Sequence, residues 1–142
     1  MKKFIMALMA VVVVGGMLTS CESEDGKWDP IKLTINGAKC KKSTQDVPVE
    51  GGVYKVYSSN YGQLWLIGVM EDGERLKPVG DEYSVVGPEV RYEGSWYDVR
   101  YDEAGNIVVS IDALPSGETE VKRSLYLDLE SGDAFSSFTF RQ

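Results

Sequence analysis

Histidine is absent from the 142-residue sequence. Its absence excludes Ser-His-Asp and Cys-His catalysis, zinc sites that use imidazole, and pH switching by histidine. Glycoside hydrolysis needs only two carboxylates at a set separation, so it is not excluded on this ground. The sequence holds 22 Asp and Glu residues, and nothing singles out one pair of them. We therefore predict a protein that is not an enzyme and uses no cofactor or metal.

Cysteine is scarce as well, with Cys21 and Cys40 as its two occurrences. If Cys21 carries another covalent modification, Cys40 has no second cysteine with which to form a disulfide within the chain. Cys40 lies among Lys39, Lys41 and Lys42, whose positive charges would lower the pKa of its thiol. No base or orienting group adjoins Cys40 in the sequence, so we interpret it as structural or incidental.

Positive charge is in deficit, because 15 Lys and Arg residues oppose 22 Asp and Glu residues. Lys2 and Lys3 belong to an N-terminal segment that is predicted to be removed. The remaining chain then carries 13 basic and 22 acidic side chains, a formal charge of −9. Nucleic acids and anionic lipid surfaces both require basic residues on their partners. The composition thus predicts no nucleic-acid partner and no membrane binding through the folded domain itself.

One apolar run, residues 4–17, is too short for a membrane span, which needs about 20 apolar residues. Two lysines precede it and a small-residue boundary follows it, as in an export signal. The boundary Leu18-Thr19-Ser20-Cys21 resembles the lipobox of bacterial lipoproteins, in which the cysteine is lipidated and becomes the first mature residue. The resemblance implies a signal peptide over residues 1–20 and acyl chains, such as palmitate, on Cys21 as a stable membrane anchor.

An acidic cluster, residues 22–25, follows the predicted lipidation site directly. Because a charge-rich run cannot bury enough apolar surface to order itself, residues 21–29 are predicted to form a flexible tether. The cluster also resembles the export tag of surface-exposed lipoproteins in gut-type Gram-negative anaerobes. This resemblance implies an outer-membrane protein with its domain on the cell surface; the alternative is the periplasmic face of the membrane.

Residues 30–142 lack any sustained helical period and are enough for one domain with a core. Short runs of β-forming residues are separated by Gly, Asn, Asp and Pro, which favours short strands joined by turns. Strands are predicted over residues 31–35, 53–58, 64–69, 89–93, 96–101, 107–111, 124–129 and 135–140, with a short edge segment at 47–49 and a short strand at 83–86. The pattern predicts an all-β fold, an Ig-like antiparallel β-sandwich of about seven to nine strands.

Two of these strands have clear orientations. Residues 124–129 alternate with three leucines on one face, and Phe138 and Phe140 share a face of the last strand, so both sets should point inward.

Residues 64–69 are apolar on both faces, which predicts a strand in the middle of a sheet that is covered on both sides. Trp65 shares a face with Ile67 and Val69 by period two, and it is predicted to lie in the core.

Several landmarks of the domain follow one another in a characteristic order. They are Gly51-Gly52 before a strand, Asn60, Trp65, Trp96, Gly105-Asn106-Ile107, Arg123 and the closing Phe138-Thr139-Phe140-Arg141-Gln142. Together they resemble the BACON domain, an Ig-like module associated with carbohydrate-active proteins of gut bacteria, over residues 30–142. The resemblance implies a non-catalytic module that binds or presents glycans. The alternative is a structural or protein-interaction lipoprotein, such as a spacer, an adhesin subunit or an accessory subunit of an outer-membrane complex.

The strand predicted over residues 96–101 is the best candidate for a glycan site, because aromatic ring faces stack on the apolar faces of sugars. Period two directs the more apolar set, Tyr97, Val99 and Tyr101, toward the core. The opposite set is then exposed, and we predict it as the candidate glycan-binding residues: Trp96, Asp98 and Arg100. The alternative is that Trp96 packs inward at the end of the strand. The predicted partners are the membrane, through Cys21, and a polysaccharide or another surface protein.

Overall fold

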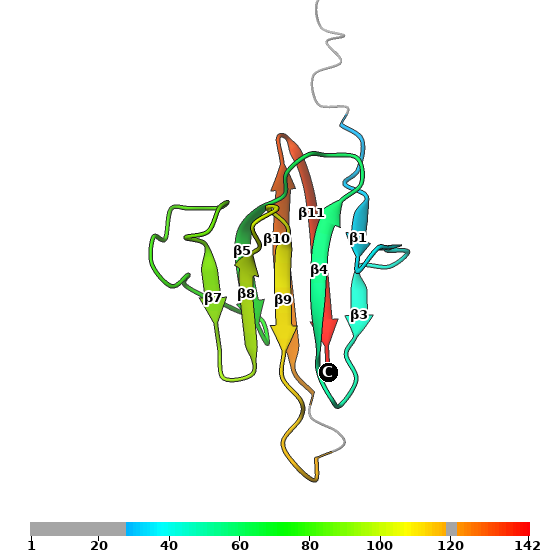
Figure 1. Cartoon of the computed structure of the whole chain (residues 1–142), viewed down its shortest axis with the longest axis vertical. Helices are drawn as coiled ribbons and strands as arrows, with labels where there is room; N and C mark the ends of the chain where they lie inside the picture. Colours follow the sequence, from blue (N-terminus) through cyan, green and yellow to red (C-terminus); the bar gives the residue numbers. More distant parts are fainter. Residues whose placement is uncertain (1–27, 119–121) are drawn as a thin grey trace, which may run out of the picture.

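Strands that alternate apolar and polar residues build two sheets in the computed structural model, which describes residues 28–118 and 122–142 (Figure 1). Sheet A has the order β2 (Ala38–Lys39), β1 (Leu33–Ile35), β4 (Gly52–Ser58), β9 (Ile107–Ile111), β8 (Tyr97–Tyr101) and β7 (Arg91–Glu93). Sheet B has the order β3 (Thr44–Asp46), β11 (Ala134–Arg141), β10 (Ser124–Ser131), β5 (Trp65–Glu71) and β6 (Glu74–Arg75). The predicted signal peptide (1–20), the Cys21 lipidation site and most of the tether lie outside the described residues.

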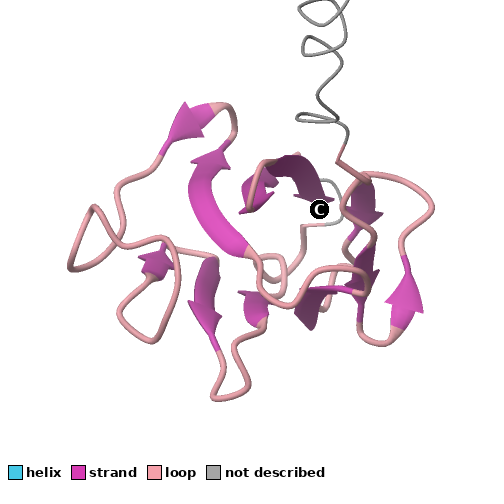
Figure 2. Cartoon of the chain, turned by 90° about the horizontal axis from the view of Figure 1, so that it is seen from above, coloured by secondary structure: helices cyan, strands magenta, loops and turns pink. Residues whose placement is uncertain are grey.

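The strand order is that of an immunoglobulin-like sandwich. The run β1-β4-β9-β8 in sheet A corresponds to strands A-B-E-D, and β11-β10-β5 in sheet B corresponds to G-F-C. All pairs are antiparallel except β3 with β11, because the chain crosses from sheet A to sheet B before β3. Figure 2 shows the strands from above, with no helix among the residues that the structure describes. The predicted all-β sandwich is confirmed, and no helix in the described residues is long and apolar enough to cross a membrane.

The core lies between the two sheets and follows from the alternation. Leu125, Leu127 and Leu129 of β10 are fully buried, as are Phe138 and Phe140 of β11. The two phenylalanine rings meet edge to face, with centroids 5.2 Å apart. The inward orientation predicted for both strands is confirmed.

Tight turns occur at an Asn-Gly pair and an Asp-Gly pair. Asn36 and Gly37 have φ values of 50° and 84°, and Asp72 and Gly73 have 49° and 87°. Two successive positive φ values define the type I′ turn, whose twist matches that of a β-hairpin. These turns join β1 to β2 and β5 to β6.

Three predicted segments differ from the structure. Residues 47–49 form no strand, because the parallel pairing with β11 is made by the residues just before them, in β3. Residues 83–86 also form no strand, although the Val85 carbonyl accepts the Leu66 N–H at 2.8 Å at the side of β5. The prediction that residues 64–69 are covered on both sides is wrong: one face of β5 packs in the core and the other is partly exposed.

Candidate functional site

Trp96 does not face solvent, so the prediction of an outward ring is wrong and the inward alternative is confirmed. Its side chain is 6% exposed, and its Nε1–H donates to Glu71 Oε1 at 2.7 Å. The Tyr97 hydroxyl donates to the other oxygen of the same carboxylate at 3.0 Å. Trp96 precedes β8 rather than belonging to it, so both Trp96 and Tyr97 turn inward. From Tyr97 onward, Val99 and Tyr101 are buried as predicted.

A guanidinium group lies over the Trp96 ring. The Arg123 guanidinium carbon lies 4.5 Å from the ring centroid, which is cation–π distance. Arg123 Nε donates to Gln142 Oε1 at 2.8 Å, and its Nη2 donates to the Asp112 carbonyl at 3.1 Å. The end of β9, the start of β10 and the end of β11 are thus joined around Trp96. This arrangement is structural and leaves the ring unavailable to a ligand.

The pKa of the Tyr97 hydroxyl is raised well above its usual range, first by burial and then by its hydrogen bond to Glu71 and by that carboxylate's charge. The pKa of Tyr101 is also raised, mainly by burial. Its hydroxyl shares its one proton between the Leu64 and Val85 carbonyls, and its oxygen accepts the Leu66 N–H at 2.9 Å. Both phenols therefore remain protonated and act as hydrogen-bonding struts in the core.

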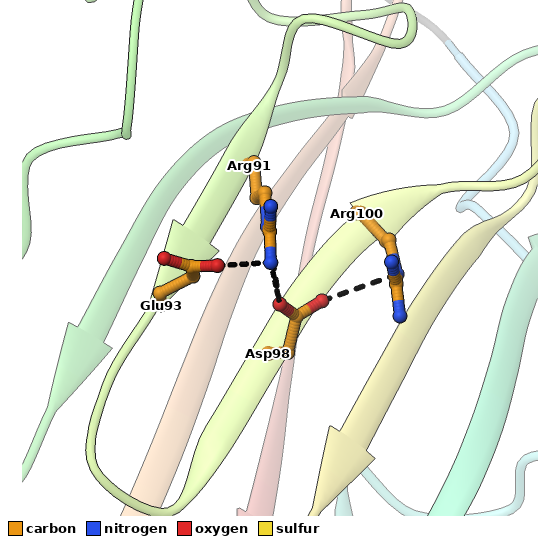
Figure 3. A network of polar contacts seen from close by, with 4 residues as sticks. All are labelled: Arg91, Glu93, Asp98 and Arg100. Carbon is orange, nitrogen blue, oxygen red and sulfur yellow. Dashed lines mark hydrogen bonds and ion pairs between the residues drawn. The ribbon is translucent and has the colours of Figure 1, made fainter.

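Asp98 and Arg100 lie on the outer face of sheet A, as predicted, but their charges are already engaged (Figure 3). Asp98 Oδ2 accepts from Arg91 Nε at 3.1 Å and from Arg91 Nη2 at 3.0 Å. Arg100 Nε lies 3.2 Å from Asp98 Oδ1, an ion pair without hydrogen-bond geometry. Arg91 also contacts Glu93. The structure therefore keeps Asp98 and Arg100 together and separates both from Trp96.

The tryptophan on an outer face is Trp65, which we predicted in the core. β5 carries a β-bulge opposite Asp128 and Leu129 of β10, and the extra residue shifts the alternation. Leu66 and Val69 consequently both face the core, and Trp65 is left partly exposed on the outer face of sheet B. The prediction failed because one inserted residue reverses the face of every residue beyond it.

Neighbouring strands place further groups beside Trp65. Trp65 pairs with Glu130 of β10, and Glu130 pairs with Phe135 of β11, whose ring is 64% exposed. Further along β10, Asp128 and Tyr126 alternate outward with partial exposure. We call the outward set the sheet B platform: Trp65, Tyr126, Asp128, Glu130 and Phe135.

An arginine completes the sheet B platform over a glycine. Gly68 pairs with Asp128, and a Cβ at Gly68 would lie 2.7 Å from Arg75 Nη2. Arg75 Nη2 donates to the Ile67 carbonyl at 2.8 Å, which holds the guanidinium over the sheet. The bare glycine thus makes room for a cation in the same layer as the rings and carboxylates. Rings flanked by charged and hydroxyl groups are the chemistry that binds sugars.

Cys40 is half-buried, and burial raises the pKa of its thiol, with a smaller lowering by a backbone hydrogen bond. The expectation that neighbouring lysines lower this pKa is wrong, because the cost of burying the thiolate dominates and the lowering comes from the backbone of Ile35. Within the described part of the chain, no three Cys, Asp or Glu side chains cluster closely enough to hold a metal ion.

Comparison with known proteins gives one informative likeness. No family model matches the chain, and no curated protein matches it. An NMR structure of a protein from Bacteroides thetaiotaomicron is similar, with a TM-score of 0.63 and 29% sequence identity. The match covers 85% of this chain and 92% of that chain. The likeness supports the sandwich fold and carries no statement about activity.

Proposed function

We propose that this chain is a lipid-anchored, non-catalytic cell-surface module that binds glycans through the sheet B platform. The observation that carries the proposal is the row Trp65–Glu130–Phe135, which sets two aromatic rings on either side of a carboxylate on a partly exposed sheet face. The rings offer apolar surfaces to pyranose faces, while Glu130, Asp128 and Arg75 offer acceptors and donors to sugar hydroxyls. The resemblance to the BACON domain supports the same function.

The proposed anchor keeps the platform close to the membrane. Trp28, the first described residue, follows Cys21 by seven positions. A fully extended chain spans about 3.5 Å per residue, so the domain begins at most about 25 Å from the lipidated cysteine. In the proposed outer-membrane, surface-exposed location, a module this near the membrane would be within reach of polysaccharides at the cell surface. A periplasmic orientation of the same anchor is the alternative.

Affinity gel electrophoresis of the mature protein against a panel of neutral polysaccharides tests the binding function. We expect one or more polysaccharides to retard the protein, and Trp65→Ala to abolish the retardation. Tyr83→Ala is the matched control, because Tyr83 is 84% exposed and lies outside the two sheets. No retardation by any polysaccharide would refute glycan binding, and retardation unaffected by Trp65→Ala would refute the platform.

A protein-interaction role is the second candidate, and one observation favours it. The segment between β6 and β7 exposes three apolar side chains, Val79, Tyr83 and Val86. Exposed apolar groups gathered in one segment are typical of protein interfaces. If the chain is an accessory subunit, crosslinking in intact cells should capture a partner protein, and Tyr83→Ala should abolish that crosslink. Loss of the crosslink in Trp65→Ala but not in Tyr83→Ala would contradict this candidate.

A further inference from the structure

Lysines gather in one part of this acidic chain. Residues 30–45 contain four lysines and no Asp or Glu: Lys32, Lys39, Lys41 and Lys42. The chain as a whole has 22 acidic against 15 basic residues. The lysine-rich stretch covers β1, β2 and the crossing to β3, at the edge of the sandwich visible in Figure 1. Positive charge is therefore concentrated where the chain passes from one sheet to the other.

The crossing encloses a pocket of about 330 Å³. Its floor is apolar, because Ile31 and Leu33 of the sheet A side meet Phe138 of β11, and all three side chains are buried. Its rim is polar, with four lysines and three serines: Lys32, Lys39, Lys41, Lys42, Ser43, Ser136 and Ser137. The half-buried Cys40 also lines the pocket. The volume is at the lower end of the range for small-molecule sites. We call this site the lysine pocket.

The ammonium groups of the lysine pocket are not neutralised within the part of the chain that the structure describes. Salt bridges there engage Lys55, Arg91, Arg100 and Arg141, and none engages a rim lysine. All four rim lysines are exposed. Unpaired ammonium groups attract opposite charge, so the rim of the lysine pocket favours an anion.

We infer that the lysine pocket binds the sulfate or phosphate ester group of an anionic saccharide. Ammonium groups bind tetrahedral oxyanions by charge-assisted hydrogen bonds. The serine hydroxyls on the rim pair with sugar hydroxyls, and the apolar floor receives a pyranose face. The saccharide part of this inference rests on the proposed glycan-binding function. The inference adds that the ligand of the lysine pocket carries an anionic group.

Isothermal titration calorimetry of the mature lipoprotein in neutral detergent tests the inference, with glucose, glucose 6-sulfate and glucose 6-phosphate as probes. We expect one or both esters to bind about tenfold more tightly than glucose at low salt, since two or more ion pairs form. The ester that is preferred identifies the anion. Inorganic sulfate or phosphate that binds as tightly as its sugar ester would overturn the saccharide assignment.

Two variants of equal charge separate the pocket from general electrostatics. Lys41→Gln/Lys42→Gln should remove the preference for the esters. Lys77→Gln/Lys122→Gln, which changes exposed lysines outside the pocket, should retain it. Equal losses in both variants, or equal affinities for all three sugars in the unaltered protein, would overturn the inference.

The outcome is independent of the sheet B platform. Trp65→Ala should leave the ester preference unchanged. If the preference is absent while polysaccharide binding still depends on Trp65, the lysine pocket fails and the proposed function stands. If the preference depends on Lys41 and Lys42 while no neutral polysaccharide binds, the platform fails and the pocket stands.

Discussion

At the scale of single residues, Glu71 is the polar centre of one end of the sandwich. Its two oxygens accept from the Trp96 indole and the Tyr97 hydroxyl, at 2.7 Å and 3.0 Å. The Arg123 guanidinium lies over the ring of the same indole. A carboxylate so placed depends on both donors, because a partly buried acceptor without its partner keeps the cost of desolvation.

Trp96→Phe therefore removes a donor from Glu71 while keeping most of the ring. We expect the free energy of unfolding to fall by about 1–3 kcal/mol. Urea denaturation followed by circular dichroism measures the change. Trp65→Phe is the control, and it should change stability by less than about 0.5 kcal/mol, because Trp65 is partly exposed. Equal effects of the two substitutions would contradict the structural role of Trp96.

Asp102 stabilises the turn before β9 in a pH-dependent way. It accepts the Asn106 N–H at 2.9 Å and the Asn106 amide at 3.2 Å, and these bonds hold the pKa of Asp102 below its usual value. A depressed folded-state pKa gives stability that is present above the unfolded value of about 3.9 and lost as pH falls through the folded value. Asp102→Asn should thus be less stable than the unaltered protein at pH 6, with a smaller difference at pH 3. A difference independent of pH, measured by urea titration at both values, would refute this.

At the scale of elements, the turns and the glycines next to strands fix how segments meet. Gly51 has a φ of 77°, and a Cβ there would lie 2.2 Å from the Ile111 carbonyl oxygen of the neighbouring strand β9. Gly37 has a φ of 84°, and a Cβ there would meet no atom within 4 Å. Both glycines have a positive φ, and they differ in the space around them.

Alanine at these two positions separates backbone strain from steric overlap. Gly37→Ala should cost about 1 kcal/mol through the positive φ alone. Gly51→Ala should cost at least about 2 kcal/mol more, because β9 must also move. Thermal and urea denaturation of both variants measures the difference. Similar losses of unfolding free energy in the two variants would contradict this, since β9 would then move away from the new Cβ without a measurable loss of stability.

The same scale explains what the sequence could and could not predict. Strands with unbroken alternation, such as residues 124–129, were predicted with their correct faces, because period two needs no knowledge of a partner. Trp65 and Trp96 were both assigned to the wrong face. The bulge in β5 turns Trp65 outward, and Trp96 turns inward because it lies just before the start of β8. Both features depend on pairing with distant segments. The sheet B platform was not predicted from the sequence, because its residues come from three strands, β5, β10 and β11, that only the fold brings side by side.

At the scale of the whole molecule, the acidic sandwich has two unlike surfaces. The sheet B platform presents rings and carboxylates, whereas the lysine pocket presents cations on the opposite side of β11 from β10. Two surfaces of different chemistry suit a glycan that has both neutral and charged units.

The anchor itself is tested by Cys21→Ala. Without the thiol, no acyl chain attaches, so we expect a protein that leaves the membrane fraction or keeps its signal peptide. Fractionation of cells, together with metabolic labelling by a palmitate analogue, measures both outcomes. Normal processing and retention in the outer membrane would contradict the anchor.

The indole NMR signals test the central claim most directly, because the three tryptophans report on three places in the protein: Trp28, Trp65 and Trp96. Each signal is assigned by its Trp→Phe variant, and the protein is titrated with a polysaccharide that retards it in gels. Binding at the sheet B platform predicts that the Trp65 signal shifts with ligand concentration while the Trp96 signal, held by Glu71, stays in place. A bound polysaccharide that leaves the Trp65 signal unmoved would contradict the account.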